Sequence, residues 1–129
     1  MGDLSANKIF TFYNEVPVPE TIIPFVSPNE KICFAAKTIK GVAIFTDKRI
    51  LVADKQGLKA KKTEYYTIPF KNILTYVIET SGRLDLESDS EIKLVLSGGI
   101  CIEFRFIKDE NIDELLLKVY HLINNYIIG

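Results

Sequence analysis

From residue 30 onward, hydrophobic and polar side chains alternate along the chain, which is typical of strands that bury one face. Turn residues such as glycine separate the alternating stretches and mark where each strand ends. We therefore predict seven β-strands, at about 32–37, 42–46, 49–53, 63–68, 73–80, 91–97 and 100–106.

The last of these stretches shows the pattern most clearly. Ile100, Ile102, Phe104 and Phe106 share one face, whereas Cys101, Glu103 and Arg105 share the other. The Gly98-Gly99 pair before this strand predicts a hairpin turn, as Asp47-Lys48 does earlier in the chain. An antiparallel sheet with one buried face follows, and Cys101 should point away from that face.

Near the C-terminus the apolar spacing changes to that of a helix. Asp109 or Asn111 can cap its N-terminus, and Glu110, Asp113 and Glu114 suit the positive end of the helix dipole. The predicted fold is therefore α+β but mainly β: a seven-stranded antiparallel barrel or orthogonal sandwich capped by a C-terminal α-helix. The helical stripe consists of Ile112, Leu115, Leu116, Val119, Leu122, Ile123, Tyr126 and Ile127, widened by Leu117 and Tyr120.

The first residues differ from the rest of the chain. Four prolines lie between positions 17 and 28, and proline disfavours a long helix or a central strand. The segment is nevertheless too apolar for a free tail. We expect residues 1–27 to form an irregular, proline-rich arm packed on the barrel or on a neighbouring subunit, and residues 28–129 to form the domain itself.

Composition narrows the function classes. The 129 residues carry a net charge of −1, so no overall charge attracts nucleic acid. The N-terminus lacks the pattern of a signal peptide, and no apolar run is long enough to span a bilayer. Two cysteines without a CxxC motif indicate reduced thiols in a cytoplasmic protein.

The sequence offers little catalytic or metal-binding chemistry. His121 is the only histidine, and no serine or cysteine pattern around it indicates an activated nucleophile. Asp85, Glu87, Asp89 and Glu91 are spaced by two, but they lack the glycine and terminal glutamate of a calcium loop and indicate a solvated acidic loop. We expect no enzyme activity, no catalytic residue, no metal site and no cofactor.

Two sets of residues are candidates for binding. A basic set on two predicted hairpins is a candidate anionic-ligand patch, with a solvated basic face as the alternative: Lys48, Arg49, Lys55, Lys59, Lys61 and Lys62. An apolar and aromatic set is a candidate oligomer interface, since tyrosine and other aromatic residues are enriched at interfaces: Phe10, Phe12, Tyr13, Phe25, Tyr65, Tyr66, Leu117 and Tyr120. Adjacent Tyr65 and Tyr66 must face opposite sides of their strand.

Several local motifs resemble those of the bacterial pleckstrin-homology (PH) domain family. They cover about residues 28–128. The quoted segments are Phe45-Thr46-Asp47-Lys48-Arg49-Ile50, Asp54-Lys55-Gln56-Gly57-Leu58, Lys61-Lys62-Thr63-Glu64-Tyr65, Ile68-Pro69-Phe70-Lys71-Asn72-Ile73, Glu79-Thr80-Ser81-Gly82, Asp85-Leu86 and Glu91-Ile92-Lys93-Leu94. The resemblance implies a PH-like barrel in a stand-alone bacterial protein and a homo-oligomeric ring, typically built from pentamers. It implies neither an enzyme activity nor a settled ligand.

The basic pattern that holds phosphoinositides in eukaryotic PH domains is missing, because Lys37 and Lys40 are followed by Gly41, Val42 and Ala43. A membrane lipid is therefore disfavoured as the ligand. We expect a non-catalytic module that self-assembles and mediates contact with an unknown protein partner. The alternative is a module that binds an anionic ligand, peptide or membrane headgroup through the basic hairpins.

Overall fold

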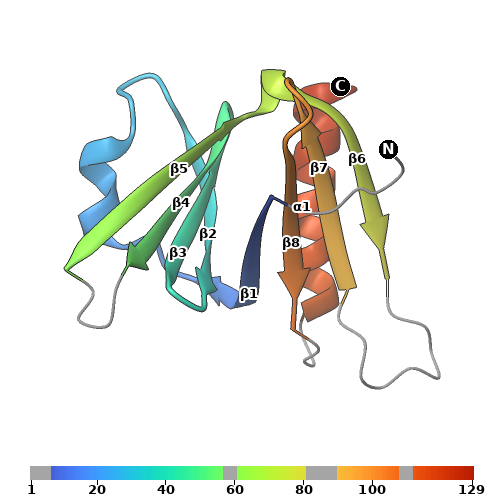
Figure 1. Cartoon of the computed structure of the whole chain (residues 1–129). Coiled ribbons are helices and arrows are strands. Elements are labelled where there is room, and N and C mark those ends of the chain that lie inside the picture. The colour runs from blue at the N-terminus through green and yellow to red at the C-terminus, as the bar shows by residue number, and fades with distance from the viewer. Residues whose placement is uncertain (1–6, 57–60, 81–89, 108–111) are drawn as a thin grey trace.

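A computed structural model describes residues 7–56, 61–80, 90–107 and 112–129. Its elements, in chain order, are β1 (Lys8–Val16), η1 (Glu20–Phe25), β2 (Ile32–Thr38), β3 (Gly41–Thr46), β4 (Arg49–Gln56), β5 (Lys62–Pro69), η2 (Phe70–Asn72), β6 (Ile73–Glu79), β7 (Ser90–Leu96), β8 (Cys101–Phe106) and α1 (Ile112–Ile127). The seven predicted strands are all present as β2 to β8, and α1 is the predicted helix (Figure 1). The predicted caps Asp109 and Asn111 lie outside the described residues.

The strands form one eight-stranded sheet in the order β5-β4-β3-β2-β1-β8-β7-β6. The mainly β fold with a C-terminal helix is confirmed, but three details of the prediction are wrong. The described sheet has eight strands instead of seven, β1 and β8 pair in parallel, and the sheet does not close into a barrel. Strands β5 and β6 are consequently its two open edges.

The additional strand, β1, lies in the segment predicted to be irregular. It pairs antiparallel with β2 and parallel with β8, and so joins the two halves of the sheet. Phe10 and Phe12 alternate with more exposed residues along it, which is the period-two pattern of a strand. The four prolines all follow β1, so they end the strand and do not interrupt it.

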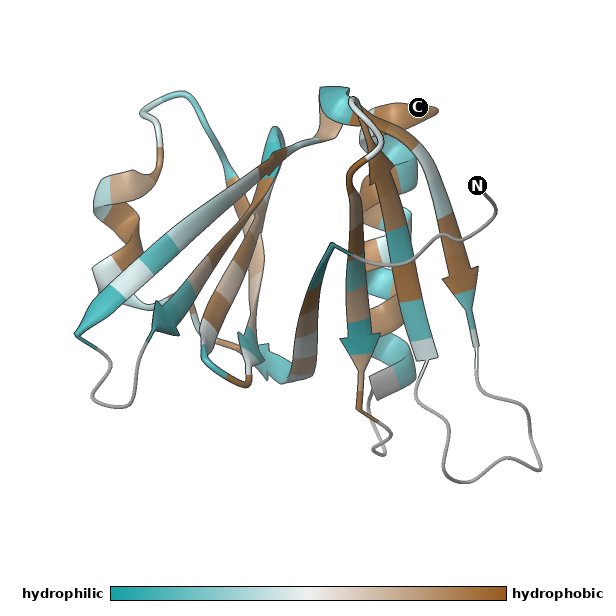
Figure 2. Cartoon of the chain, in the orientation of Figure 1, coloured by the Kyte–Doolittle hydropathy of each residue, from teal (hydrophilic) through white to brown (hydrophobic). Residues whose placement is uncertain are grey.

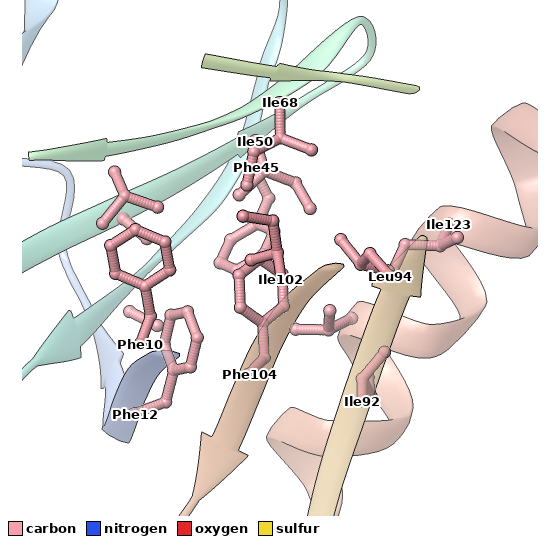
Figure 3. Close-up of a cluster of buried hydrophobic side chains, with 14 of the residues drawn as sticks. Phe10, Phe12, Phe45, Ile50, Ile68, Ile92, Leu94, Ile102, Phe104 and Ile123 are labelled. Carbon is pink, nitrogen blue, oxygen red and sulfur yellow. The ribbon is translucent and has the colours of Figure 1, made fainter. Parts of the chain in front are cut away.

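One main core lies between the two halves of the sheet. In Figure 3, Phe10 and Phe12 of β1 point into the same cluster as Phe45, and Leu94 of β7 lies beside Ile123 of α1. The helix contacts β7, β1 and η2, so it covers one side of this core. Burial of this cluster is the main stabilisation of the fold, at roughly 25 cal/mol per Å² of apolar surface.

The arm after β1 builds a second, smaller core. Ile22 of η1 is fully buried against Ala35, Ile44 and Leu51, on the opposite face of the strands from the main core. Figure 2 shows hydrophobic residues on η1 as well as inside the sheet. Strands β2 to β4 are therefore covered on both faces, whereas β5 and β6 keep exposed residues at the sheet edges.

Candidate functional site

A groove of about 500 Å³ opens where the β3–β4 hairpin, the β5–β6 corner and the end of α1 meet. A volume of this order is typical of ligand sites. Two of the sequence motifs, at 45–50 and 68–73, both contribute to its wall. The lining residues are Ser27, Glu30, Asp47, Lys48, Arg49, Thr67, Pro69, Phe70, Lys71 and Tyr126.

Arg49 is held in place by an extensive set of hydrogen bonds. Its Nε lies 2.8 Å from Glu30 Oε2, and its Nη2 lies 3.0 Å from Glu30 Oε1. Its Nη1 donates to Thr67 Oγ1 at 3.0 Å, and Nη2 also donates to the Phe25 carbonyl at 2.6 Å. These acceptors use the N–H donors of the guanidinium, so Arg49 has a structural role in the wall of the groove. It is not a free cation of a ligand patch.

Glu30, which the sequence did not mark, is the acidic partner. The Arg49 guanidinium and a hydrogen bond from Thr46 Oγ1 lower the pKa of Glu30 to about 2, against the opposing effect of burial. The Thr46 hydroxyl in turn accepts from the backbone N–H groups of Lys48 and Arg49. These bonds fix the predicted Asp47-Lys48 hairpin against the loop before β2.

The other wall of the groove is aromatic. The rings of Phe70 and Tyr126 are nearly parallel, at 3° and 5.5 Å between centroids. Lys48 and Lys71 are exposed beside them, and neither forms an ion pair with another residue of the described chain. The groove thus offers an apolar surface next to two cations, which suits a ligand with an apolar part and a negative charge.

The predicted basic patch does not form one surface. Register places Arg49 opposite Pro69 at one end of the β4–β5 pair and Gln56 opposite Lys62 at the other. Lys48 is therefore about 23 Å from Lys55 along the strand, given about 3.3 Å per strand residue, and farther still from Lys61 and Lys62. Lys59 lies outside the described residues. The cations form two separate groups because the two hairpins are at opposite ends of the same strands.

The open edge of β5 runs between these two groups. Phe70 N donates to Lys48 O, and this marks their pair as hydrogen-bonded. Because hydrogen-bonded and non-bonded pairs alternate in an antiparallel ladder, the backbone N–H and C=O groups of Thr63, Tyr65 and Thr67 point away from β4. No other strand among the described residues pairs with these groups, so they form an open edge that ends at the groove.

The predicted interface residues fall into three groups. Phe10 and Phe12 are buried in the chain's own core, since β1 is an internal strand, so they are not exposed to a second chain. Tyr66 and Tyr120 are half-buried against that core. Tyr13, Phe25, Tyr65 and Leu117 are exposed, and the rings of Phe25 and Tyr65 stack at 3.9 Å outside the sheet.

The residues considered for catalysis or metal binding are not brought together. His121 is exposed on α1, where its ring contacts Tyr120. Glu91 lies on β7, where burial and the neighbouring Glu103 raise its pKa. The other acidic residues considered, Asp85, Glu87 and Asp89, lie outside the described residues. Among the described residues, no three His, Cys, Asp or Glu side chains are placed to hold a metal ion.

A model of the family described as "Bacterial PH domain" matches residues 5–127. The uncharacterised protein YjqA of Bacillus subtilis (strain 168) is 40% identical over 100 residues, which are 76% of this chain and 78% of that protein. The family match includes β1, although the resemblance seen in the motifs began at about residue 28.

Solved structures agree with the family match. A DUF1696 family protein with a pleckstrin-homology domain from Shewanella loihica PV-4 superposes with a TM-score of 0.72 at 30% identity, covering 88% of this chain and 95% of that one. A pleckstrin homology domain from Shewanella amazonensis SB2B gives a TM-score of 0.65 at 32% identity, covering 84% of each chain. A longer PH domain protein from Exiguobacterium sibiricum 255-15 is 23% identical, with a TM-score of 0.59 over 93% of this chain and 61% of that one, and shows the fold alone.

Proposed function

This chain belongs to the bacterial PH domain family, and we propose that it is a non-catalytic interaction module that self-assembles into a homo-oligomeric ring. Its relatives in B. subtilis and Shewanella have PH domains or no described function, and none of their descriptions mentions an activity. The proposal also includes a cytoplasmic location, as predicted from the cysteine usage of the sequence. No helix among the described residues is long and apolar enough to cross a membrane.

The observation that carries the proposal is the open edge of β6. Its sequence, Ile-Leu-Thr-Tyr-Val-Ile-Glu, contains no proline or lysine, which are the residues that commonly protect an edge strand. Leu74 on this strand is 66% exposed, and Figure 2 shows hydrophobic residues continuing along β6. An apolar strand with unpaired backbone groups favours contact with another chain.

A ring needs two different surfaces on each copy, because its contacts are head-to-tail. The β6 edge supplies one surface. The other consists of exposed apolar side chains elsewhere, among which Tyr13, Phe25, Tyr65 and Leu117 were predicted from the sequence. The ring closes when the rotation per copy divides a full turn, and a pentamer is the size that the family resemblance implies.

Light scattering after size exclusion tests the proposal directly. We expect a discrete multiple of 14.6 kDa that persists at high salt, because the contact is mainly apolar. Leu74→Lys should lower the mass, whereas Ile128→Lys, a matched change at a residue that is 74% exposed on the C-terminal turn, should not. A wild-type monomer at all concentrations would refute self-assembly.

A second candidate function is binding of an anionic ligand through the basic hairpins. It is favoured by Lys61 and Lys62, which are both exposed at the start of β5. Titration with inorganic phosphate, acidic peptide and phosphatidylserine vesicles should show binding that weakens with salt and with neutralisation of both lysines. Absence of binding to all three probes would exclude this function.

A further inference from the structure

We propose that the open β5 edge and the groove at its end bind an extended, acidic segment of a partner protein as an added β-strand. This inference rests on the second candidate function, and it names the ligand class and the way it docks. Three observations carry it: the unpaired backbone of β5, the aromatic groove at the end of that strand, and the lysines at both ends of the edge.

The backbone supplies the first contact. Thr63, Tyr65 and Thr67 direct their N–H and C=O groups away from β4, so an extended chain can pair with three successive outward residues of β5. The stacked pair of Phe25 and Tyr65 flanks this edge on the outer side. Side chains of an added strand would alternate between this aromatic pair and the opposite face.

The groove supplies an anchoring point. Pro69 has no N–H to donate, so strand pairing ends there and the chain of the ligand enters the groove. Tyr126 is 42% exposed and stacks on the buried Phe70, so its ring is an aromatic surface against which one large apolar side chain can pack. When a peptide adds as a strand to a sheet edge, the backbone hydrogen bonds give the affinity and the side-chain pocket gives the specificity.

The charges select an acidic ligand. Lys61 and Lys62 lie at the start of the edge, and Lys48 and Lys71 lie at its end, all exposed. Arg49 and Glu30 neutralise each other, and so do Asp54 and Lys8 beside the strand, while Glu64 on β5 and Asp47 in the groove remain as carboxylates. The edge is therefore positively charged in a chain whose net charge is −1. Since cations lie at both ends, acidic residues should flank the apolar centre of the ligand.

The length of β5 sets the length of the probe. The strand has eight residues, so an eight-residue extended peptide matches it. We would use a fluorescein-labelled peptide with two acidic residues at each end and a Val-Thr-Val-Phe centre, and measure binding to the full chain by fluorescence anisotropy. We expect saturable binding that weakens about tenfold between low and moderate salt.

Two altered peptides separate strand pairing from simple charge attraction. A peptide with lysine in place of each acidic residue should not bind. A peptide of unchanged charge that is N-methylated at alternate residues cannot donate to the β5 edge, and it should bind at least about tenfold more weakly. Equal binding of the N-methylated and unmodified peptides would overturn the proposed strand addition.

Variants of the protein test the same surface. Thr63→Pro removes an outward N–H that makes no bond to β4, so it should weaken peptide binding while Thr63→Val should not. Lys48→Glu with Lys71→Glu should also abolish binding. The control variant is Lys37→Glu with Lys118→Glu, which changes the net charge by the same amount at exposed sites away from the edge. This variant should still bind the peptide. Equal loss in both charge-reversed variants would overturn the proposal.

Two further readouts distinguish the inference from the proposed functions. Binding to phosphatidylserine vesicles or phosphate without binding to the peptide would overturn the inference and leave the second candidate function intact. Light scattering of the peptide-bound protein should show an unchanged mass. If the peptide instead dissociates the oligomer, the β5 edge is the contact between copies and the proposal is wrong.

Discussion

The Arg49 guanidinium donates two hydrogen bonds to the Glu30 carboxylate, from Nε at 2.8 Å and from Nη2 at 3.0 Å. The Glu30 side chain is only 2% exposed, so this is a largely buried, charge-assisted pair. It joins the loop before β2 to the start of β4, residues that are 19 positions apart in the sequence. One wall of the groove depends on this pair.

Arg49→Ala should destabilise the fold, because it leaves the Glu30 carboxylate buried without its partner. Breaking a buried ion pair costs about 3–5 kcal/mol, and the partial exposure of Arg49 favours the lower end of that range. Urea unfolding measures the loss. The double variant Arg49→Met with Glu30→Gln removes both charges and should recover part of it. A loss below about 1 kcal/mol for Arg49→Ala would contradict the structural role of the pair.

Stability should fall in acid because of Glu30. Its folded pKa of about 2 is below the ordinary value of 4.5, so its contribution is complete above pH 4.5 and is lost as the pH falls toward 2. The difference between these two pKa values, about 2.5, corresponds to an expected contribution of about 3 kcal/mol. The free energy of unfolding, measured against pH for the wild type and for Glu30→Gln, should differ most above pH 4.5 and converge below it. A difference that stays constant across this range would exclude the mechanism.

The sequence predicted the features that depend on neighbouring residues. Alternation and turn chemistry located β2 to β8, and Gly98 and Gly99 adopt positive φ angles of 87° and 82°, as a tight hairpin requires. Tyr65 and Tyr66 face opposite sides for the same local reason. The helix was evident from the spacing of its apolar residues.

Features that depend on distant partners were missed. Strand β1 pairs with β8, which lies about 90 residues later, and no turn connects the two. Phe10 and Phe12 therefore looked like exposed residues of an arm. Arg49 was assigned to a basic patch because its neutralising partner, Glu30, is remote in sequence. The motifs at 45–50 and 68–73 were visible, but the sequence did not show that they line one groove.

The burial of β1 can be tested with two phenylalanine variants. Phe12→Ala should cost about 3–5 kcal/mol, because Phe12 is fully buried among other rings of the main core. Phe25→Ala should cost no more than about 1.5 kcal/mol, since Phe25 is 46% exposed and mainly stacks on Tyr65. Similar losses in the two variants would contradict the position of β1.

Deletion of residues 1–28 removes β1 from the middle of the sheet. It should therefore unfold the domain as well as affect assembly.

Among the glycines that the structure describes, Gly41 is the one where an added methyl group meets the closest contact. A Cβ at Gly41 would lie 2.1 Å from the carbonyl oxygen of Ala53, across the β3–β4 pair. Because the clash is with backbone, no side-chain movement can relieve it, and the two strands must separate. Gly41→Ala should cost about 1–3 kcal/mol or more and shift the amide signals of β3 and β4 in an NMR spectrum. Gly99→Ala is the matched control, since nothing lies within 4 Å of its Cβ and its cost comes from the positive φ alone. Gly99→Ala should leave the β4 signals unchanged. If Gly41→Ala also left the β4 signals unchanged, β3 and β4 would not be as close at Gly41 as the structure shows.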